Sequence, residues 1–288
     1  MSAQPSESPI NIATHIETSD RIVAPQRARG SLTVAGKRRG AASVLGDLYQ
    51  SGCLKALFPR CDPAALTAVF LNTSGGMTGG DVLGITAQAG AGSRLTLTSQ
   101  AAERVYRAAP GAPARLTTHL VAAPGGRIDW LPQETILFNG AALHRRLDVD
   151  LAADATFLGV EPLVFGRRAM GETVTEATLA DNITVRRDGA LVFADALRLD
   201  GDIAAQLAGP ATGAGAGAVA GVIYAAADAE AHLGALRDML GGAGGASLIR
   251  PGILFVRVLA LDSLDLRRIL MPVLGRLSGA ALPKTWML

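Results

Sequence analysis

Acidic side chains beside apolar or glycine-rich segments have the clearest potential for chemistry in this sequence. Carboxylate oxygens bind divalent cations reversibly, whereas thiolates hold soft and borderline metal ions much more tightly. Isolated carboxylates also act as turn caps, or as ion-pair partners of arginines such as Arg145, Arg167 and Arg168. Weak oxygen ligation and a purely structural role therefore both stay open for Asp81, Asp129, Glu134, Asp154, Glu161 and Glu172.

A glycine-rich segment, Asn-Thr-Ser-Gly-Gly-Met-Thr-Gly-Gly-Asp at residues 72–81, directly follows an apolar run that ends at Leu71. A phosphate-binding loop needs a lysine next to Ser or Thr, and this segment has no lysine. The alternative is a tight connection between strands, in which the glycines accept positive φ and Asp81 bonds nearby backbone amides. A nucleotide-dependent enzyme using the glycine-rich loops is therefore kept only as the alternative hypothesis.

Other motifs for catalysis or resident metals are missing. The four histidines lie far apart, and neither His-Glu-x-x-His nor Cys-x-x-Cys spacing occurs, so any zinc-type site would have to be assembled by the fold. No Gly-x-Ser-x-Gly segment marks a hydrolase. These observations predict a protein that is not an enzyme and that binds no permanent cofactor.

The charge balance argues against nucleic acid as a partner. Lysine and arginine total 27 against 25 acidic residues, a net charge of +2, and only 4% of residues are aromatic. No basic stripe or set of base-stacking side chains stands out.

The sequence predicts a cytoplasmic protein on two grounds. The first residues lack the basic and apolar regions of a secretory signal. The two cysteines, Cys53 and Cys61, are too few for a disulfide framework.

Residues 203–227 carry no charge, which raises the question of a membrane span. Pro210, five glycines and flanking aspartates argue against one. Gly215, Gly217 and Gly221 loosely mimic a dinucleotide-binding fingerprint, but no strand is predicted before them and no helix after them. The segment is predicted to be a flexible Gly/Ala linker, with membrane association as a competing hypothesis.

Short runs rich in Val, Ile, Leu, Thr and Phe predict a mainly β protein. Residues 27–34 alternate with a period of two, which is typical of a half-buried strand. Asp188 and Gly189 lie between two runs and predict a two-residue hairpin turn. Strands are predicted at residues 27–34, 64–72, 94–99, 114–122, 134–138, 155–160, 183–187, 190–194 and 253–261.

Two helices are predicted in the C-terminal quarter. Residues 226–240 have leucines on one face and are followed by two glycines. Asp262 or Ser263 can cap a second helix, which contains Pro272 and ends at Gly279.

Residues 1–24 are predicted to be a disordered polar tail, and residues 25–288 are predicted to form a single domain. Strands without long helices between them favour a sandwich or solenoid.

Residues 71–81 resemble a segment of the UreD (UreH) family of urease accessory proteins. Further matching segments follow in the family's order: residues 98–107, which end in Arg-Val-Tyr-Arg; residues 129–138, which contain Trp-Leu-Pro-Gln-Glu; residues 154–172, which contain Gly-Arg-Arg-Ala-Met-Gly-Glu; and Pro-Lys-Thr-Trp at residues 283–286. The chain departs from the family pattern at residues 48–53, where many members have a proline-rich segment, and at Lys284, which replaces an arginine.

The resemblance implies a non-enzymatic, chaperone-like scaffold. It would bind apo-urease and, with UreF and the GTPase UreG, help to insert nickel into the urease active site. The implied fold is mainly β, irregular, β-helix-like and layered, with a few α-helices.

The resemblance further implies a water-filled internal passage through which nickel travels. By motif position, the candidates for contact with nickel in transit are Asp81, Glu134, Asp154, Glu161 and Glu172. Candidates for the loops and walls of the passage are Ser74, Gly75, Gly76, Thr78, Gly79, Gly80, Tyr106 and Trp130, although buried aromatic residues more often fill a core.

Overall fold

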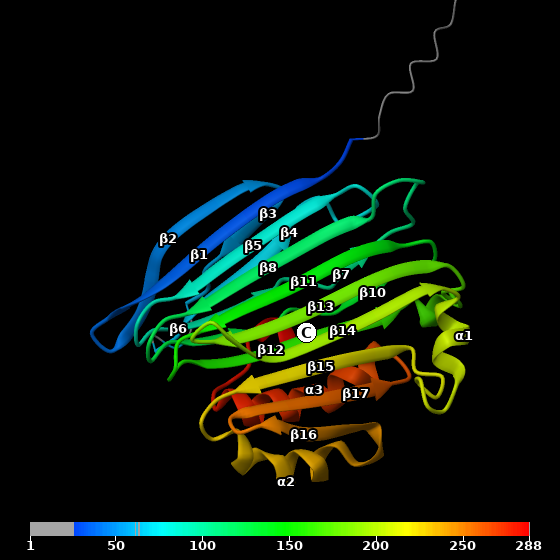
Figure 1. Ribbon diagram of the computed structural model, residues 1–288. Helices are drawn as coiled ribbons and strands as arrows, with labels where there is room; N and C mark the ends of the chain where they lie inside the picture. Colours follow the sequence, from blue (N-terminus) through cyan, green and yellow to red (C-terminus); the bar gives the residue numbers. More distant parts are fainter. Residues whose placement is uncertain (1–25, 61, 63, 288) are drawn as a thin grey trace, which may run out of the picture.

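The computed structural model describes residues 26–60, 62 and 64–287 as two β-sheets and a layer of helices (Figure 1). The predicted tail at residues 1–24 lies outside the described residues. Among the described residues, no helix has both the length and the apolar character that crossing a bilayer requires.

Sheet A has seven strands in the order β14-β13-β11-β8-β5-β1-β2. Their bounds are β1 (Arg29–Arg39), β2 (Ala42–Gly52), β5 (Val82–Ala89), β8 (Ala114–Ala122), β11 (Ala142–Leu151), β13 (Ala177–Arg187) and β14 (Ala190–Gly201).

Sheet B has ten strands. The main path runs β16-β17-β15-β12-β9-β6-β4-β3, while β10 pairs with β12 and β7. The bounds are β3 (Leu54–Leu57), β4 (Leu66–Asn72), β6 (Arg94–Ser99), β7 (Glu103–Val105), β9 (Arg127–Trp130), β10 (Thr135–Leu137), β12 (Thr156–Phe165), β15 (Ala218–Ala225), β16 (Gly244–Arg250) and β17 (Ile253–Ala260).

The chain between β4 and β13 winds as a flattened coil. Successive long strands alternate between the sheets, so that β4, β6, β9 and β12 stack in parallel in sheet B while β5, β8, β11 and β13 stack in parallel in sheet A. Figure 1 shows this stacking as a progression of colour along the molecule. The predicted layered, β-helix-like fold is therefore confirmed.

Two apolar cores follow from this arrangement. Strands of sheet A alternate buried and exposed side chains, as in β5 and β11, because only the inner face of that sheet is covered. Strands β12 and β15 of sheet B are buried almost throughout, since one face meets sheet A and the other meets helices. A run without alternation is the expected pattern for a strand buried on both faces.

Three α-helices occur in the described ranges: α1 (Ile203–Ala208), α2 (Ala229–Leu240) and α3 (Ser263–Ser278). The two helices predicted in the C-terminal quarter are confirmed as α2 and α3. Gly241 and Gly279 follow them at φ of 51° and 61°, a region that glycine enters without steric cost. Short 3-10 turns lie at Arg168–Met170, Gly241–Ala243 and Lys284–Met287.

The strand predictions at residues 94–99 and 114–122 coincide with β6 and β8. The hairpin at Asp188 and Gly189 is also confirmed, with φ values of 49° and 77° between β13 and β14. Positive φ at both central residues is the requirement of a type I′ turn.

The prediction of a flexible linker at Gly215, Gly217 and Gly221 is wrong at Gly221, which lies in a strand. Residues Ala218–Ala225 form β15, which pairs with β12 and β17 and has every residue buried. Gly221 lies within this strand, where an added Cβ would come within 3.2 Å of the Phe255 ring. Small residues are needed in this strand because its two faces pack closely against their neighbours. The resulting richness in Gly and Ala resembles the composition of a linker.

A buried aspartate joins sheet B to the end of α3. Asp129 accepts hydrogen bonds from Arg94 at 2.7 Å and from Arg127 at 2.8 Å. Both arginines also donate to the carbonyl of Ser278, the last residue of α3. The carbonyl end of a helix favours positive charge. Asp129 therefore has a structural role in the fold.

Removing the side chain that caps α3 is expected to destabilise the protein modestly. The Asp262 carboxylate accepts the backbone N–H of Asp265 at 2.9 Å. Asp262→Ala should lower the free energy of unfolding by about 1 kcal/mol, the usual cost of losing an N-cap. Urea denaturation measures this loss. Asp262→Asn keeps an accepting oxygen and serves as the control, and an equal loss in both variants would contradict a capping role.

Candidate functional site

An internal cavity of about 170 Å³ lies between the two sheets. Its wall comes from strands β3, β4, β5, β8, β9, β10, β11 and β12 and from the segments 72–76, 99–104 and 132–133. Most of the wall is apolar, with Leu54, Phe70, Leu83, Ile85 and Leu116 among its residues. Two acids line it, Glu161 and Glu103, and they have very different surroundings.

Glu161 belongs to a buried cluster of charges. The Arg145 guanidinium lies 2.7 Å from a Glu161 carboxylate oxygen and 2.6 Å from an Asp181 oxygen, and all three side chains are nearly inaccessible to solvent. Arg145 also donates to the Thr135 hydroxyl, and the Trp130 indole N–H donates to Glu161 at 2.7 Å. Each of the three side chains thus has a polar partner, but the two carboxylates share a single guanidinium, which leaves the cluster one excess negative charge when both acids are ionised.

Burial dominates the electrostatics of this cluster. Desolvation raises the pKa of Glu161 above its ordinary value, against the attraction of Arg145. Desolvation opposes the charge on Arg145 as well, but the nearby Asp181 and Glu161 carboxylates outweigh it, so the pKa of Arg145 is raised. The guanidinium therefore stays charged and holds the Glu161 carboxylate in place.

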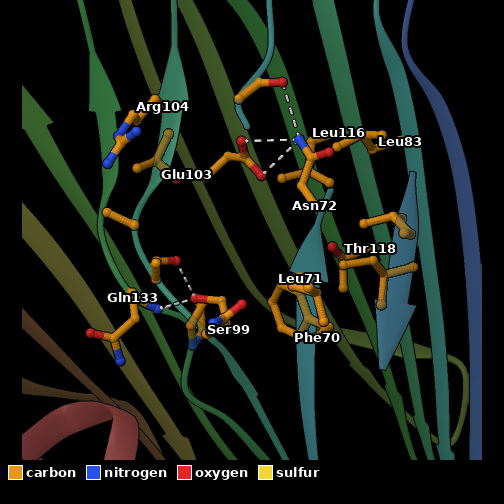
Figure 2. Close-up of a pocket in the computed structure, with 18 of the residues that line it drawn as sticks. Phe70, Leu71, Asn72, Leu83, Ser99, Glu103, Arg104, Leu116, Thr118 and Gln133 are labelled. Atoms are coloured by element: carbon orange, nitrogen blue, oxygen red, sulfur yellow. Dashed lines mark hydrogen bonds between the residues drawn. The ribbon is translucent and has the colours of Figure 1, made fainter. Parts of the chain in front are cut away.

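Glu103, in β7, is the second acid of the cavity and was not among the residues predicted from the sequence. Figure 2 shows its carboxylate and the Asn72 side chain pointing toward one another and in direct contact. The Asn72 amide nitrogen lies 3.2 and 3.4 Å from the two carboxylate oxygens and also donates to the Gly76 carbonyl. Desolvation raises the pKa of Glu103 to about 7.

The sequence signal for Glu103 is weak. Glu103 lies in the 98–107 segment that carries the family resemblance. Because Arg104 follows it directly, the sequence suggests only a local ion pair between these two residues. In the structure the two side chains do not pair. Glu103 faces the cavity and Arg104 is exposed, because neighbouring residues of a strand point to opposite sides.

The other four acids that the resemblance suggests for contact with nickel do not line the cavity. Asp81 accepts the backbone N–H groups of Ala28 and Thr78 at 2.7 and 2.8 Å, which confirms the interpretation of the glycine-rich segment as a tight connection. Asp154 accepts the N–H of Gly125 in a turn at the end of the coil. Both carboxylates hold loops in place.

Glu134 is buried on the opposite face of sheet B. Arg267 of α3 donates to both of its carboxylate oxygens at 3.1 Å, and the same arginine lies over the Trp286 ring. The Trp286 indole donates to the Leu131 carbonyl at 3.0 Å. Two of the segments that carry the family resemblance, 129–138 and 283–286, therefore meet in space and anchor α3 and the C-terminal segment to sheet B.

Glu172 lies in a separate, open hollow beside Tyr106, Phe138 and Arg167. Its carboxylate accepts from the Arg167 side chain at 2.8 Å and from the backbone N–H of Asn139. The Arg167 hydrogen bond lowers the pKa of Glu172, although burial opposes the shift. Glu172 thus shares a hollow with Tyr106 and not with Glu161.

The glycine-rich segment forms one end of the cavity. Gly75 and Gly76 line it, whereas Ser74 bonds Asn72 and Thr78 donates to the Arg107 carbonyl. At Gly76, with φ of 147°, an added Cβ would lie 2.4 Å from the Tyr106 ring, so no larger residue fits. Gly79 and Gly80 complete the turn, and β5 follows it rather than the helix that a phosphate-binding loop requires.

Trp130 and Tyr106 have different roles. Trp130 is buried, stacks on Phe70 with ring centroids 5.3 Å apart and lines the cavity. Tyr106 is 37% exposed and donates its hydroxyl to the Gly75 carbonyl at 3.1 Å. Trp130 is therefore a wall residue of the cavity, and Tyr106 supports the glycine-rich segment from outside.

Within the described part of the chain, no three or more His, Cys, Asp or Glu side chains gather closely enough to hold a metal ion. The cavity instead presents single carboxylates in a mainly apolar space.

The fold and the site together define a coiled, two-sheet β protein with a carboxylate-bearing cavity between the sheets. The chain belongs to the UreD family: the sequence model described as UreD urease accessory protein matches residues 28–287. A protein of Ruegeria pomeroyi named urease accessory protein UreD is 51% identical over 247 residues, covering 86% of this chain and 96% of the relative.

Two further relatives carry the same name. The protein of Roseobacter denitrificans is 48% identical over 262 residues, and that of Rhizobium etli is 45% identical over 263 residues; each match covers 91% of this chain and 96% of the relative. The relatives are named as accessory proteins and not as enzymes, in agreement with the prediction from the sequence.

Proposed function

We propose that this chain is a maturation factor for urease, which acts on apo-urease in the cytoplasm so that the nickel metallocentre is incorporated. We further propose that it acts in a complex with UreF and the GTPase UreG. The observation that carries the proposal is the match to the UreD family over residues 28–287, nearly the whole described chain.

The cavity supports a role in handling nickel as cargo. A hydrated divalent cation that crosses a protein needs oxygen donors that bind it weakly and release it again. Glu161 and Glu103 supply such oxygens inside a space of about 170 Å³, which has room for several water molecules. Glu161 is held by Arg145, so its position is fixed while its remaining lone pairs can face an ion.

Surface features support assembly with other proteins. On the edge strand β2, Leu48 and Tyr49 are 41% and 60% exposed. An exposed edge strand with large apolar side chains is prone to pair with another chain.

Deleting the gene in its native host tests the proposal. Urease protein should stay abundant while its nickel content and activity fall, and the restored gene should recover both. The measurements are nickel per urease active site and urease activity in extracts. Unchanged nickel content and activity in the deletion strain would contradict the proposed function.

A further inference from the structure

We propose that the open hollow lined by Tyr106, Arg107, Phe138 and Arg167 is a docking site for an acidic segment of a partner protein. The inference rests on the proposed function in one respect, since a maturation factor must bind other proteins. The shape and the charge of the hollow are features of this chain alone.

The hollow lies where three parallel strands end. Strand β10 pairs in parallel with β7 on one side and with β12 on the other. Tyr106 and Arg107 follow β7, Phe138 and Asn139 follow β10, and the loop 167–173 follows β12. Because the carboxyl ends of neighbouring parallel strands meet at one edge of a sheet, these segments enclose a volume of about 540 Å³.

Arg107 is held in place by its neighbours. Its side chain lies over Gly140, where an added Cβ would come within 2.8 Å of it. Gly140 has a φ of 82°, a region that favours glycine. The Arg107 carbonyl accepts from the Thr78 hydroxyl at 2.8 Å, and the next N–H, that of Ala108, donates to the Gly140 carbonyl at 2.8 Å. The arginine is therefore positioned in advance, which reduces the entropy lost when a partner binds.

The loop after β12 is tied to the hollow by Asn139. The Asn139 side-chain oxygen accepts the backbone N–H groups of Thr175 and Glu176 at 3.0 and 2.9 Å. Its own backbone N–H donates to the Glu172 carboxylate at 3.2 Å, and Glu172 accepts from the Arg167 side chain at 2.8 Å. The hollow is therefore formed by the chain itself, without a partner.

The hollow and its border carry more positive than negative charge. Arg167 is neutralised by Glu172. The Arg107 guanidinium lies 3.8 Å from a Glu176 carboxylate oxygen, but these side chains are 64% and 75% exposed, and such ion pairs contribute little. Arg168 donates to a backbone carbonyl at 3.1 Å, and no carboxylate of the described residues lies within ion-pair distance of it. The charges of Arg107 and Arg168 are thus available to an acidic partner.

Exposed apolar side chains beside these charges favour a protein segment over a small anion. Tyr106 is 37% exposed and packs edge-on against Phe138, with ring centroids 5.1 Å apart. Met170, in the loop after β12, is 76% exposed, and Leu261, whose carbonyl accepts from Arg168, is 55% exposed. Arginine, methionine and aromatic residues are enriched in protein interfaces. A segment with both carboxylates and apolar side chains matches this surface.

An acidic peptide tests the proposal without any urease protein. The probe is a fluorescein-labelled peptide of Glu-Gly-Leu repeats, and its fluorescence anisotropy is measured as the full-length chain is added. The peptide should bind, and added NaCl should weaken the binding because salt screens exposed charges. The same peptide with Lys in place of Glu should bind at least about tenfold more weakly. Failure of the acidic peptide to bind, or equal binding of the basic peptide, would overturn the proposal.

Arg107→Glu should raise the Kd of the acidic peptide about tenfold, because it replaces an attractive charge by a repulsive one. Arg39→Glu is the matched control and should bind like the wild type. It makes the same change of charge at an exposed residue, at the end of β1 opposite to the end that lies beside the start of β5.

Arg107→Lys keeps the positive charge and should retain most of the affinity, which separates loss of charge from a disturbed loop. Arg107→Lys binding as weakly as Arg107→Glu would contradict recognition by charge. Equal affinities of Arg107→Glu and the wild type, or equal losses in Arg107→Glu and Arg39→Glu, would also overturn the docking site.

The outcome is separable from that of the gene deletion. If the acidic peptide binds through Arg107 while the deletion strain keeps urease fully loaded with nickel, the docking site stands and the maturation role fails. If deletion empties urease of nickel while Arg107→Glu binds the peptide like the wild type, the maturation role stands and the docking site fails.

Discussion

The free energy of unfolding of Glu103→Gln is expected to exceed that of the wild type by about 3 kcal/mol at pH 8. At pH 5 the difference should be less than about 1 kcal/mol. Desolvation raises the pKa of Glu103 from 4.5 to about 7 in the folded protein. Glutamine has a similar shape, keeps a carbonyl oxygen for the Asn72 amide and carries no charge at any pH. A gain of stability from this substitution would be unusual, since most substitutions destabilise a protein.

The direction of the pH effect follows from proton linkage. The folded protein binds a proton at Glu103 more tightly than the unfolded chain does, so this group favours folding while it is neutral in both states, below pH 4.5. As the pH rises through the interval from 4.5 to about 7, the unfolded chain ionises first and the folded state loses stability. Above pH 7 the cost of ionising Glu103 is complete.

Urea denaturation of both proteins between pH 5 and pH 8 measures this effect. The informative quantity is the difference between the variant and the wild type at each pH, because it cancels the titration of all other groups. Glu176→Gln, at an exposed site, should show a difference near zero at every pH. A difference between Glu103→Gln and wild type that does not change with pH would contradict the raised pKa.

The fold was predictable where local patterns coincide with the final environment. Residues 94–99 and the turn at Asp188 and Gly189 carry their signals within a few residues, and both predictions are confirmed. Strand β15 was not predictable in this way. Its small, uncharged residues are explained by neighbours on both faces, from sheet A and from α3, which are distant in the sequence.

The site was predictable only in part. Glu161 could be found because it belongs to a segment that carries the family resemblance, and it does line the cavity. Asp81 and Glu134 were found in the same way but hold a loop and α3 instead. Whether an acid faces the cavity depends on the strand that carries it and on whether an arginine from another element pairs with it. Glu103 faces the cavity, whereas Arg267 pairs with Glu134, and the residue types alone predict neither placement.

The cluster around Arg145 gives the largest expected loss of stability. Arg145→Met should lower the free energy of unfolding by about 3 to 5 kcal/mol at pH 7.5, because it leaves the buried Glu161 and Asp181 carboxylates without their cation. The side chains of these two acids are only 6% and 8% exposed, so water cannot replace the guanidinium. Urea denaturation, or the soluble yield if the variant does not fold, provides the measurement.

Arg146→Met is the matched control, because the next residue of β11 points to the outer face of sheet A. Its side chain is 60% exposed and pairs with Asp148, and exposed ion pairs contribute at most about 1 kcal/mol. The triple variant Arg145→Met with Glu161→Gln and Asp181→Asn should recover most of the loss, since the unpaired charges cause it. If Arg145→Met costs no more than Arg146→Met, or if the triple variant is as unstable as the single one, the cluster is not held together by its charges.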